Sequence, residues 1–548
     1  MKSGAEILVE SLLKEAVEVV FAYPGGAALE IFDVLGQTPE IRLVVTRNEQ
    51  GAAHAASGYA RVSKKPGVCL ATSGPGATNL ITGIATAYMD SIPLVVFTGQ
   101  VPLKMIGTDA FQEVDITGIS EPITKHNYLV KAAASIPRIV KEAFYIASSG
   151  RPGPVLIDLP KDVAQALAKA EVCEKINLRG YKPNLVGHQG QLKQIIKLLK
   201  EAKRPLICAG GGVLSAQAEE ELLVLAEKLN IPVINTMMGL GSISREHPLA
   251  LGMLGTYGLP EANLAVQTCD LFIALGMRFD DRVTGEVSKF APQAKIIHLD
   301  IDSAEIGKNV AVDLPLVGDL KIVLQQLLAD LPEEQKDNWW SLPEKKESIS
   351  GLTFKKIMMV LNEFLDEKTI VTTDVGQHQV GAAQWLKIKK PRTFISSGGL
   401  GTMGYGIPAG IGAQIAAPEA VVLVLTGDGS FQMGLAELGT CLEENLPLKI
   451  ILINNQALGM VKQLQDHYCQ GRHTAVHFRR RPEFKYLAKA YGALSLTVEK
   501  AVDLREKINE LLNRPGLGLL EIKVAAGENV YPVVLGGKGL EEMEWGDE

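Results

Sequence analysis

Residues 421–455 read VVLVLTGDGSFQMGLAELGTCLEENLPLKIILINN. An apolar strand closes on GDG at 427–429, a helix follows, and a second apolar strand closes on NN at 454–455. A right-handed β-α-β crossover places both strand ends at the same carboxyl edge of a parallel sheet. The side chains of Asp428 and Asn455 offer hard oxygen ligands, which at such an edge can hold Mg²⁺ against a phosphate. The stretch therefore predicts a parallel α/β sheet with a metal and phosphate site.

Ordinary turns are the alternative interpretation of the two strand ends. Asp-Gly and Asn-Asn are common turn dipeptides. Two such ends at the spacing of one crossover, with glycines that leave room for the oxygens of a ligand, favour the metal site.

These residues resemble the GDG…NN signature of the thiamine-diphosphate enzymes. The resemblance implies that Asp428 and Asn455 hold Mg²⁺ and that the backbone carbonyl of Ala457 completes the protein ligands. It also implies a thiamine diphosphate bound at this edge.

The composition is that of a large globular protein. The chain has 548 residues, 47% hydrophobic and 21% charged, a length that predicts about three domains. A formal net charge of −7 argues against a nucleic-acid partner. The acidic N-terminus and the lack of a long uncharged run predict neither an export signal nor a membrane span.

The cysteines favour a reducing cytoplasm. They include no C-x-x-C pair, so neither a zinc site nor a disulfide framework is expected. The six lie at positions 69, 173, 208, 269, 441 and 469.

Three blocks along the chain alternate short apolar runs with helix-like stretches, which predicts parallel sheets covered by helices. We expect an N-terminal pyrimidine-binding domain at 1–165, a central flavin-type domain at 188–335 and a C-terminal diphosphate-binding domain at 352–548. Polar segments at 176–191 and 331–351 separate them. The predicted fold is α/β, with three doubly wound parallel-sheet domains.

A G-x-G-x-x-G match at 399–404 raises a nicotinamide site as an alternative. The preceding TFISSGG is a poor candidate for a buried strand, and Asp428, which follows the match, is flanked by glycines that suit a phosphate better than a ribose. No G-x-x-x-x-G-K-[ST] supports a P-loop.

Glu49 follows the apolar run LVVT at the start of an expected helix. The simplest interpretation is that the helix dipole stabilises this carboxylate and that it has no other role. Beside the GDG…NN signature, the resemblance implies instead that Glu49 hydrogen-bonds the aminopyrimidine nitrogen of the cofactor and activates it. For His54 we expect packing only.

Further residues are carried over by motif from the thiamine-diphosphate enzymes. Met403 would support the bent cofactor, although methionine is also a common core filler. The resemblance implies that the cofactor is contacted by Gly376, Gln377, His378, Gln379, Gly401, Met403, Gly429, Ser430 and Met460.

Within these enzymes, the chain resembles the acetohydroxyacid (acetolactate) synthase catalytic subunits of the biosynthetic, FAD-containing type. GQVPLKMIGTDAFQE at 99–113 and MRFDDRVTG at 277–285 carry the resemblance. It implies active-site roles for Phe111, Gln112, Lys161 and Arg282. Arg282 would meet the carboxylate of the second substrate, although an Asp/Arg ion-pair turn is the alternative.

The central block carries the residues expected at FAD. Glycines after a strand could offer backbone amides to a diphosphate. The resemblance places the flavin against Arg151, Gly210, Gly211, Gly212, Thr236, Met237, Met238, Asp300, Ile301 and Asp319.

Two places depart from the family pattern. Thr256-Tyr257-Gly258 stands where Met-His-Gly is usual, which puts FAD binding in question. Leu464 replaces a usual tryptophan in the acceptor pocket, so we expect reduced preference for 2-oxobutyrate over pyruvate.

The function implied is decarboxylation of pyruvate and ligation to a second 2-oxo acid, the first step of branched-chain amino-acid biosynthesis. The resemblance further implies a homodimer or homotetramer and a separate small regulatory subunit. Alternatives are a pyruvate oxidase, a glyoxylate carboligase, an inert homologue serving as a structural partner, or a nicotinamide dehydrogenase.

Overall fold

The protein is described by a computed structural model that covers residues 1–170, 176, 178–331, 335–340 and 351–546. Cys173, parts of the expected linkers 176–191 and 331–351, and residues 547–548 lie outside the described residues. The other cysteines carry free thiols.

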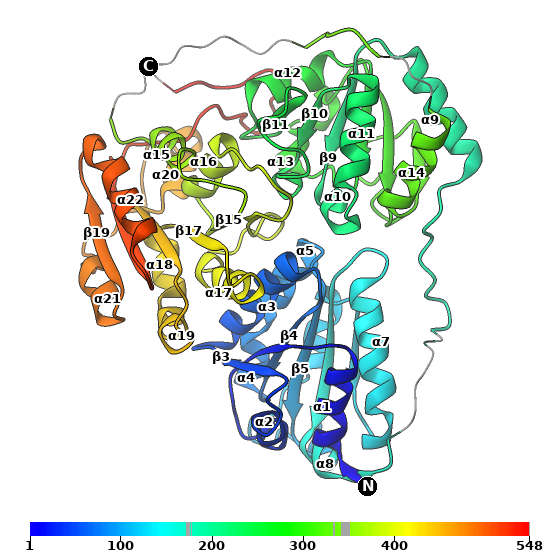
Figure 1. The fold of residues 1–548 in the computed structure, drawn as a ribbon, viewed down its shortest axis with the longest axis vertical. Helices are drawn as coiled ribbons and strands as arrows, with labels where there is room; N and C mark the ends of the chain where they lie inside the picture. The colour runs from blue at the N-terminus through cyan, green and yellow to red at the C-terminus, as the bar shows by residue number, and fades with distance from the viewer. Residues whose placement is uncertain (171–175, 177, 332–334, 341–350, 547–548) are drawn as a thin grey trace.

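The described residues form three six-stranded parallel sheets and one short antiparallel pair, β1 (Lys2–Ser3) with β8 (Leu167–Ala168). This confirms the predicted α/β class. We call the three the N-terminal, central and C-terminal sheets, in chain order (Figure 1).

The N-terminal sheet has the order β3-β2-β4-β5-β7-β6. Its strands are β2 (Val19–Ala22), β3 (Arg42–Val45), β4 (Gly67–Ala71), β5 (Leu94–Gln100), β6 (His126–Leu129) and β7 (Pro154–Pro160). Its helices are α1 (Gly4–Lys14), α2 (Leu29–Gly36), α3 (Glu49–Ser63), α4 (Pro75–Asn79), α5 (Ile81–Met89), α6 (Ile116–Ser120), α7 (Ile136–Ser148) and α8 (Lys161–Gln165).

The central sheet has the order β11-β10-β9-β12-β13-β14. Its strands are β9 (Pro205–Ala209), β10 (Val233–Asn235), β11 (Ala250–Met253), β12 (Leu271–Leu275), β13 (Lys295–Asp300) and β14 (Leu314–Val317). The helices are α9 (Gln189–Glu201), α10 (Gly211–Ala216), α11 (Glu219–Leu229), α12 (Pro260–Thr268), α13 (Asp281–Thr284) and α14 (Leu320–Asp330).

The C-terminal sheet has the order β16-β15-β17-β18-β20-β19. Its strands are β15 (Thr369–Thr373), β16 (Phe394–Ile395), β17 (Val421–Gly427), β18 (Lys449–Asn454), β19 (Leu494–Val498) and β20 (Gly518–Lys523). The helices are α15 (Phe354–Leu361), α16 (Gln377–Trp385), α17 (Gly406–Ala416), α18 (Asp428–Gly434), α19 (Leu438–Glu443), α20 (Gly459–Tyr468), α21 (Phe484–Ala490) and α22 (Leu504–Asn513).

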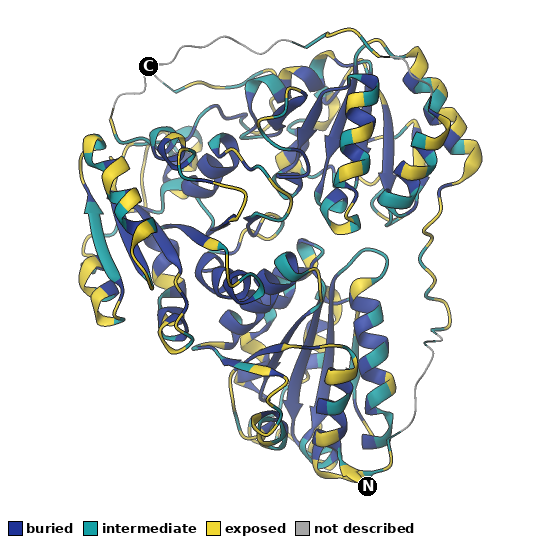
Figure 2. Ribbon diagram, viewed as in Figure 1, coloured by how far each residue is buried: buried dark blue, intermediate teal, exposed yellow. Residues whose placement is uncertain are grey.

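Most inner strands are buried along their whole length because helices cover both faces of each sheet, as Figure 2 shows in dark blue. Burial on both faces explains why strands such as β17 and β18 are continuous apolar runs and do not alternate. The edge strand β19 is only half-buried.

The N-terminal and C-terminal sheets share one strand order. In each, the second strand lies outside the first, and the sixth lies between the fourth and the fifth. No sequence repeat indicates this likeness. All strands of the three sheets fall within 1–165, 188–335 and 352–548, which we retain as proposed domain limits.

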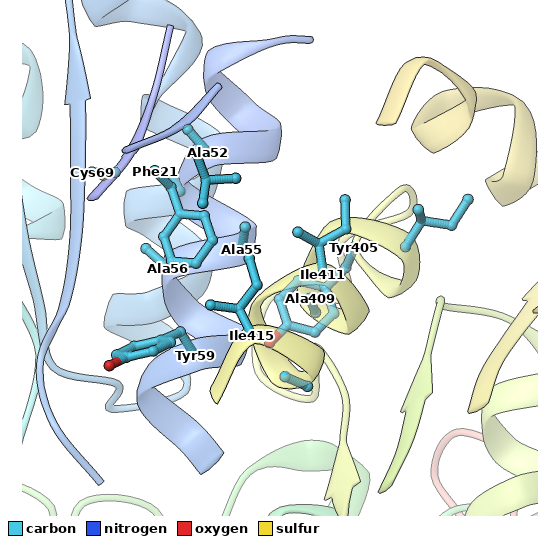
Figure 3. Close-up of a cluster of buried hydrophobic side chains, with 14 of the residues drawn as sticks. Phe21, Ala52, Ala55, Ala56, Tyr59, Cys69, Tyr405, Ala409, Ile411 and Ile415 are labelled. Carbon is cyan, nitrogen blue, oxygen red and sulfur yellow. The ribbon is translucent and has the colours of Figure 1, made fainter. Parts of the chain in front are cut away.

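Helices α3 and α17 join the N-terminal and C-terminal sheets (Figure 1). Their backbones meet closely: a Cβ on Gly58 would lie 2.1 Å from the carbonyl oxygen of Ala409, and one on Gly412 would lie 1.8 Å from that of Ala55. Figure 3 shows the apolar cluster around this crossing, with Tyr405 buried in it.

None of the helices in the described ranges combines the length and the apolar character that crossing a membrane requires.

Candidate active site

Three adjacent strands of the C-terminal sheet, β15, β17 and β18, end at one edge. Gly376 follows β15, Asp428 follows β17 and Asn455 follows β18. Because β16 and β17 lie on opposite sides of β15, the strand order reverses here, which is where parallel α/β sheets bind ligands. Gly376 has a φ of +147°, which favours glycine.

Asp428 is a buried carboxylate whose Oδ2 has no hydrogen-bond partner. Burial raises its pKa to about 7, and the backbone amides around it only partly oppose this. An unpaired buried carboxylate is costly unless a cation compensates it. The observation therefore fits a metal ligand.

Asn455 and Ala457 add oxygens beside Asp428. The Nδ2 of Asn455 donates to Oε1 of Gln377 at 2.9 Å, and the amide N–H of Ala457 donates to Oδ1 of Asn455 at 3.2 Å. Oδ1 has a second lone pair for a metal. The described residues contain no cluster of three His, Cys, Asp or Glu side chains, but a carboxylate, an amide oxygen and a backbone carbonyl make a set that suits Mg²⁺.

Gly429 lies at this edge where two neighbouring side chains leave little room for a side chain of its own. A Cβ there would come within 2.8 Å of Cδ2 of Leu458 and 3.5 Å of Cε of Met403. The Ser430 hydroxyl donates to the carbonyl of Val375 at 3.2 Å, which fixes the start of α18.

The expected diphosphate-side residues on α16 are buried. Burial lowers the pKa of His378 to about 3, so its ring is neutral, and Nε2 has no partner. The amide of Gln379 donates to Ser396 Oγ at 2.7 Å and to the Ser397 carbonyl at 3.1 Å. Thus α16 offers one unpaired polar atom at this edge.

Glu49 is the first residue of α3, directly after the N-cap Asn48. It is 8% exposed, and its Oε2 accepts a hydrogen bond of 2.9 Å from Nδ2 of Asn79. Its Oε1 would lie 3.2 Å from a Cβ on Gly76. The carboxylate therefore lies against α4, the short helix that follows β4, at the carboxyl edge of the N-terminal sheet.

The other three expected active-site residues of the N-terminal block follow the carboxyl ends of β5 and β7. Gln112 has a φ of +59° and would contact a Cβ on Gly74. Phe111 is 87% exposed, and Lys161 opens α8 in a half-buried position. These three do not line the main cavity.

A cavity of about 780 Å³ lies between the three sheets. Residues at or just beyond the end of each central strand line it. The structure brings together there, of the expected site residues, Arg151, Gly211, Gly212, Thr236, Met237, Met238, Arg282, Asp300, Ile301, Asp319, Gly376, Gln379, Gly401 and Met460.

Charged groups line one side of the cavity. Arg151 contacts Glu305 at 2.8 Å and Asp302 at 3.2 Å. Burial raises the pKa of Asp300 to about 6. Asp319 caps α14 by accepting from the amide of Ile322.

Arg282 lies on α13, and 70% of its side chain is exposed. Its nearest carboxylate is Asp281 at 3.5 Å. The guanidinium can therefore reach a carboxylate in the cavity, while the ion-pair turn with Asp281 is also present.

The glycines after β9 differ from expectation. The amides of Gly210 and Gly212 donate to the carbonyls of Leu275 and Gly276, both at 2.9 Å, so they are not offered to a diphosphate. A Cβ on Gly210 would lie 2.3 Å from the Gly276 carbonyl oxygen. Close packing of two backbones explains these glycines, and only Gly211 and Gly212 reach the cavity.

Tyr257, one of the residues that depart from the family pattern, links the central block to helices α16 and α20 of the C-terminal block. Its hydroxyl lies 3.1 Å from the sulfur of Met460, and its carbonyl accepts from Gln384 at 3.0 Å. Burial raises the pKa of Tyr257 to about 12. Tyr257, Met460 and Leu464 line the cavity together.

Sequence reasoning missed Asp90 and Asn79. Asp90 pairs with Arg61 at 2.6 Å, is buried, and accepts from the amide of Gly399 at 2.6 Å, so it holds the 399–404 loop. The only available signals were an aspartate after an apolar helix and an asparagine after GPGAT, and both are common in loops.

Glu49 and the Asp428 group follow the carboxyl edges of different sheets. Within the described ranges, no hydrogen bond or ion pair joins Glu49 to Asp428, Asn455 or Ala457. The two halves of the expected site are each preorganised; the backbone amides of Arg47 and Asn48 donate to Glu437 of the C-terminal block, but none of these bonds reaches the proposed metal ligands.

Comparison with protein families agrees with this arrangement. Residues 2–119 match the N-terminal TPP binding domain of thiamine pyrophosphate enzymes, residues 192–327 the central domain and residues 374–522 the C-terminal TPP binding domain. The chain is therefore a thiamine pyrophosphate (thiamine-diphosphate) enzyme.

Individual relatives identify one family within the thiamine-diphosphate enzymes. The chain is 49% identical to a probable acetolactate synthase large subunit of Methanocaldococcus jannaschii, over 98% of this chain and 94% of the relative. It is 44% identical to the acetolactate synthase isozyme 3 large subunit of Escherichia coli, over 99% and 98%. The chloroplastic acetolactate synthase of Arabidopsis thaliana is 47% identical, over 98% of this chain and 83% of the relative. The chain belongs to the acetolactate synthase family.

Proposed function

We propose that the chain catalyses the condensation of pyruvate, after loss of CO₂, with a second 2-oxo acid. The products are 2-acetolactate from pyruvate and 2-aceto-2-hydroxybutyrate from 2-oxobutyrate, the first step of branched-chain amino-acid biosynthesis. The observation that carries the proposal is identity of 44–49% to acetolactate synthases over nearly the whole chain. The unpaired oxygen of Asp428 supports an intact cofactor edge.

The C-terminal edge would hold the cofactor. Asp428, Asn455 and the Ala457 carbonyl are the proposed Mg²⁺ ligands, because they place oxygens of three kinds beside one another. The metal would neutralise the charge of the diphosphate. Thiamine diphosphate, when bound, supplies the carbanion chemistry that decarboxylates the donor and joins it to the acceptor.

Glu49 would act on the cofactor from the N-terminal sheet. Its carboxylate is buried and fixed by Asn79, so it can hold a proton at a ring nitrogen without rearranging. Glu49→Gln should slow hydrogen exchange at C2 of bound thiamine diphosphate sharply while Mg²⁺-dependent binding persists. Wild-type exchange in that variant would remove Glu49 from this role.

Since Glu49 and Asp428 are not joined within one chain, we propose that a second copy completes each site, as a homodimer or homotetramer. Relatives named large subunits support a separate small regulatory partner for this chain as well.

We infer that the 780 Å³ cavity takes FAD. Its volume lies in the range of about 300–1,000 Å³ usual for ligand sites, and it runs along the carboxyl edge of the central sheet. Flavin absorbance after purification tests this. A flavin that stays oxidised with pyruvate in the absence of oxygen would support a structural role; reduction would indicate an oxidase.

Arg282 of one chain and Gln112 of the second copy would orient the acceptor, because Gln112 does not line the cavity that Arg282 reaches. A dry pocket favours loss of CO₂ from a charged acid. Leu464 leaves the pocket beside Met460 without an indole, so we propose weak selectivity between acceptors.

Product identification tests the whole proposal. Purified protein with thiamine diphosphate, Mg²⁺ and FAD is given pyruvate, with and without 2-oxobutyrate, and the products are separated. We expect acetolactate alone in the first case and both products in the second. CO₂ release without either product would contradict the ligase activity.

A further inference from the structure

We propose that the C-terminal segment 528–530 orients the side-chain amide of Asn455 through Gln463 and Gln377, which makes Gln463 a positioning residue for the metal site. The inference rests on the proposed function in one respect, that Asn455 is a metal ligand.

A continuous chain of hydrogen bonds links the segment to Asn455. The amide N–H of Val530 donates to Oε1 of Gln463 at 3.1 Å, and Nε2 of Gln463 donates to the Val530 carbonyl at 2.8 Å. Nε2 of Gln377 donates to the same Oε1 of Gln463 at 3.0 Å and to the carbonyl of Glu528 at 3.1 Å. Oε1 of Gln377 then accepts from Nδ2 of Asn455 at 2.9 Å.

The direction of this relay is set by backbone groups. A side-chain amide can be turned end for end, but a backbone N–H only donates and a backbone carbonyl only accepts. Val530 presents both groups to Gln463 and so fixes which end of that amide is oxygen. Gln377 must then direct Nε2 toward Gln463 and Glu528, and its Oε1 toward Asn455.

Asn455 is the last member. Its Nδ2 is held by Gln377, and the backbone N–H of Ala457 donates to its Oδ1 at 3.2 Å, so the relay fixes one end of this amide and Ala457 the other. Only the oxygen of an amide can ligate Mg²⁺, since the NH₂ group has no free lone pair. Through Gln463 and Gln377, the backbone N–H and carbonyl of Val530 thus help to determine which atom of the Asn455 amide faces the metal site.

Burial excludes water that could satisfy an inverted amide. Gln377, Asn455 and Gln463 are 3%, 6% and 0% exposed. Gly459 leaves the space for the relay, because a Cβ there would lie 2.0 Å from Oε1 of Gln377 and 2.3 Å from Nδ2 of Asn455.

The test measures Mn²⁺ affinity in the presence of thiamine diphosphate, from the electron paramagnetic resonance signal of free Mn²⁺. Gln463→Met removes the polar atoms at similar side-chain length. We expect a loss of about tenfold in affinity, the lower end of the effect of changing a direct partner of a metal ligand, because Gln463 acts on Asn455 through Gln377. Gln465→Met, on the same helix but bonded to Thr474, is the matched control and should bind as the wild type does.

A second background separates orientation from packing. Asn455→Asp offers oxygen at both ends, so it needs no orienting, but one oxygen then faces Oε1 of Gln377, which only accepts. In that background Gln463→Met lets Gln377 turn its Nε2 toward the carboxylate, so Mn²⁺ affinity should not fall. An equal loss in both backgrounds would show that Gln463 acts only through packing and would overturn the inference.

Gly459→Ala would place a methyl group against the hydrogen bond between Gln377 and Asn455. It should therefore also weaken Mn²⁺ binding by about tenfold. Wild-type affinity in a folded Gly459→Ala or Gln463→Met protein would overturn the relay alone. A wild-type protein that binds no Mn²⁺ with thiamine diphosphate would overturn the metal site of the proposed function, and with it the relay.

Discussion

At the scale of single residues, Asp428 combines a proposed functional role with a cost to stability. Its folded-state pKa of about 7 is above the ordinary 3.8. In the metal-free protein, the favourable contribution of the protonated form is complete below about pH 4 and is lost as the pH rises to about 7. Metal binding needs the ionised form. The residue is therefore suited to metal binding more than to stability.

Asp428→Asn should stabilise the metal-free protein at high pH, because asparagine cannot ionise. We expect the midpoint of thermal unfolding at pH 8 to rise by about 10 °C relative to wild type, with the difference vanishing near pH 4. Calorimetry at both pH values measures it. Asp109→Asn, at an exposed loop position, is the control. A difference independent of pH would argue against the raised pKa.

Leu464 is the residue on which we expect the choice of acceptor to depend. Leu464→Trp should enlarge apolar contact with the extra methylene of 2-oxobutyrate and raise its preference over pyruvate by about tenfold. Competition of both acceptors, read as the product ratio, checks this. Val461→Trp, on the same helix and outside the cavity lining, should leave the ratio unchanged. A strong 2-oxobutyrate preference in the wild type would contradict the premise.

At the scale of elements, the crossing of α3 and α17 determines how the N-terminal and C-terminal sheets meet. Small residues let the two backbones touch, and an added methyl group would meet a carbonyl oxygen that a helix cannot move. Overpacking of this kind costs about 1–3 kcal/mol or more.

Gly412→Ala should therefore lower the thermal midpoint by several degrees, about 2–4 °C per kcal/mol for a domain of this size. Gly36→Ala, with open space around its Cβ position, should leave the midpoint unchanged or raise it. Equal midpoints for both variants would show that the crossing adapts easily.

At the scale of the whole molecule, mixing experiments decide whether two chains share a site. Glu49→Gln and Asp428→Asn chains are each expected to be inactive. If each site takes Glu49 from one chain and Asp428 from another, unfolding, mixing and refolding them together should restore about one quarter of wild-type activity by random pairing.

The control mixes Glu49→Gln chains with chains that carry both substitutions, which cannot form an intact site. Absence of recovery in the first mixture, with refolded wild type active, would place the whole site within one chain.

The fold class, and the strand ends that carry Asp428 and Asn455, could be predicted from sequence because they depend on local patterns. The buried strands around Asp428 and Asn455 are continuous apolar runs, and their ends carry the chemistry. β2 has no distinct strand signal, because its four residues continue the amphipathic pattern of α1, and β11 and β14 are short edge strands. The Tyr257–Met460 contact and the role of Gln463 depend on distant segments, and no local pattern encodes them.

The fusion of the outer two sheets through α3 and α17 has a mechanical consequence. Because the backbones of α3 and α17 are in contact, the two helices cannot slide past each other. Asp90 also holds the 399–404 loop by a hydrogen bond between the same two parts of the chain. We therefore expect the N-terminal and C-terminal sheets to move as one block. Any motion that admits a substrate should then involve the central sheet and the residues that follow β20.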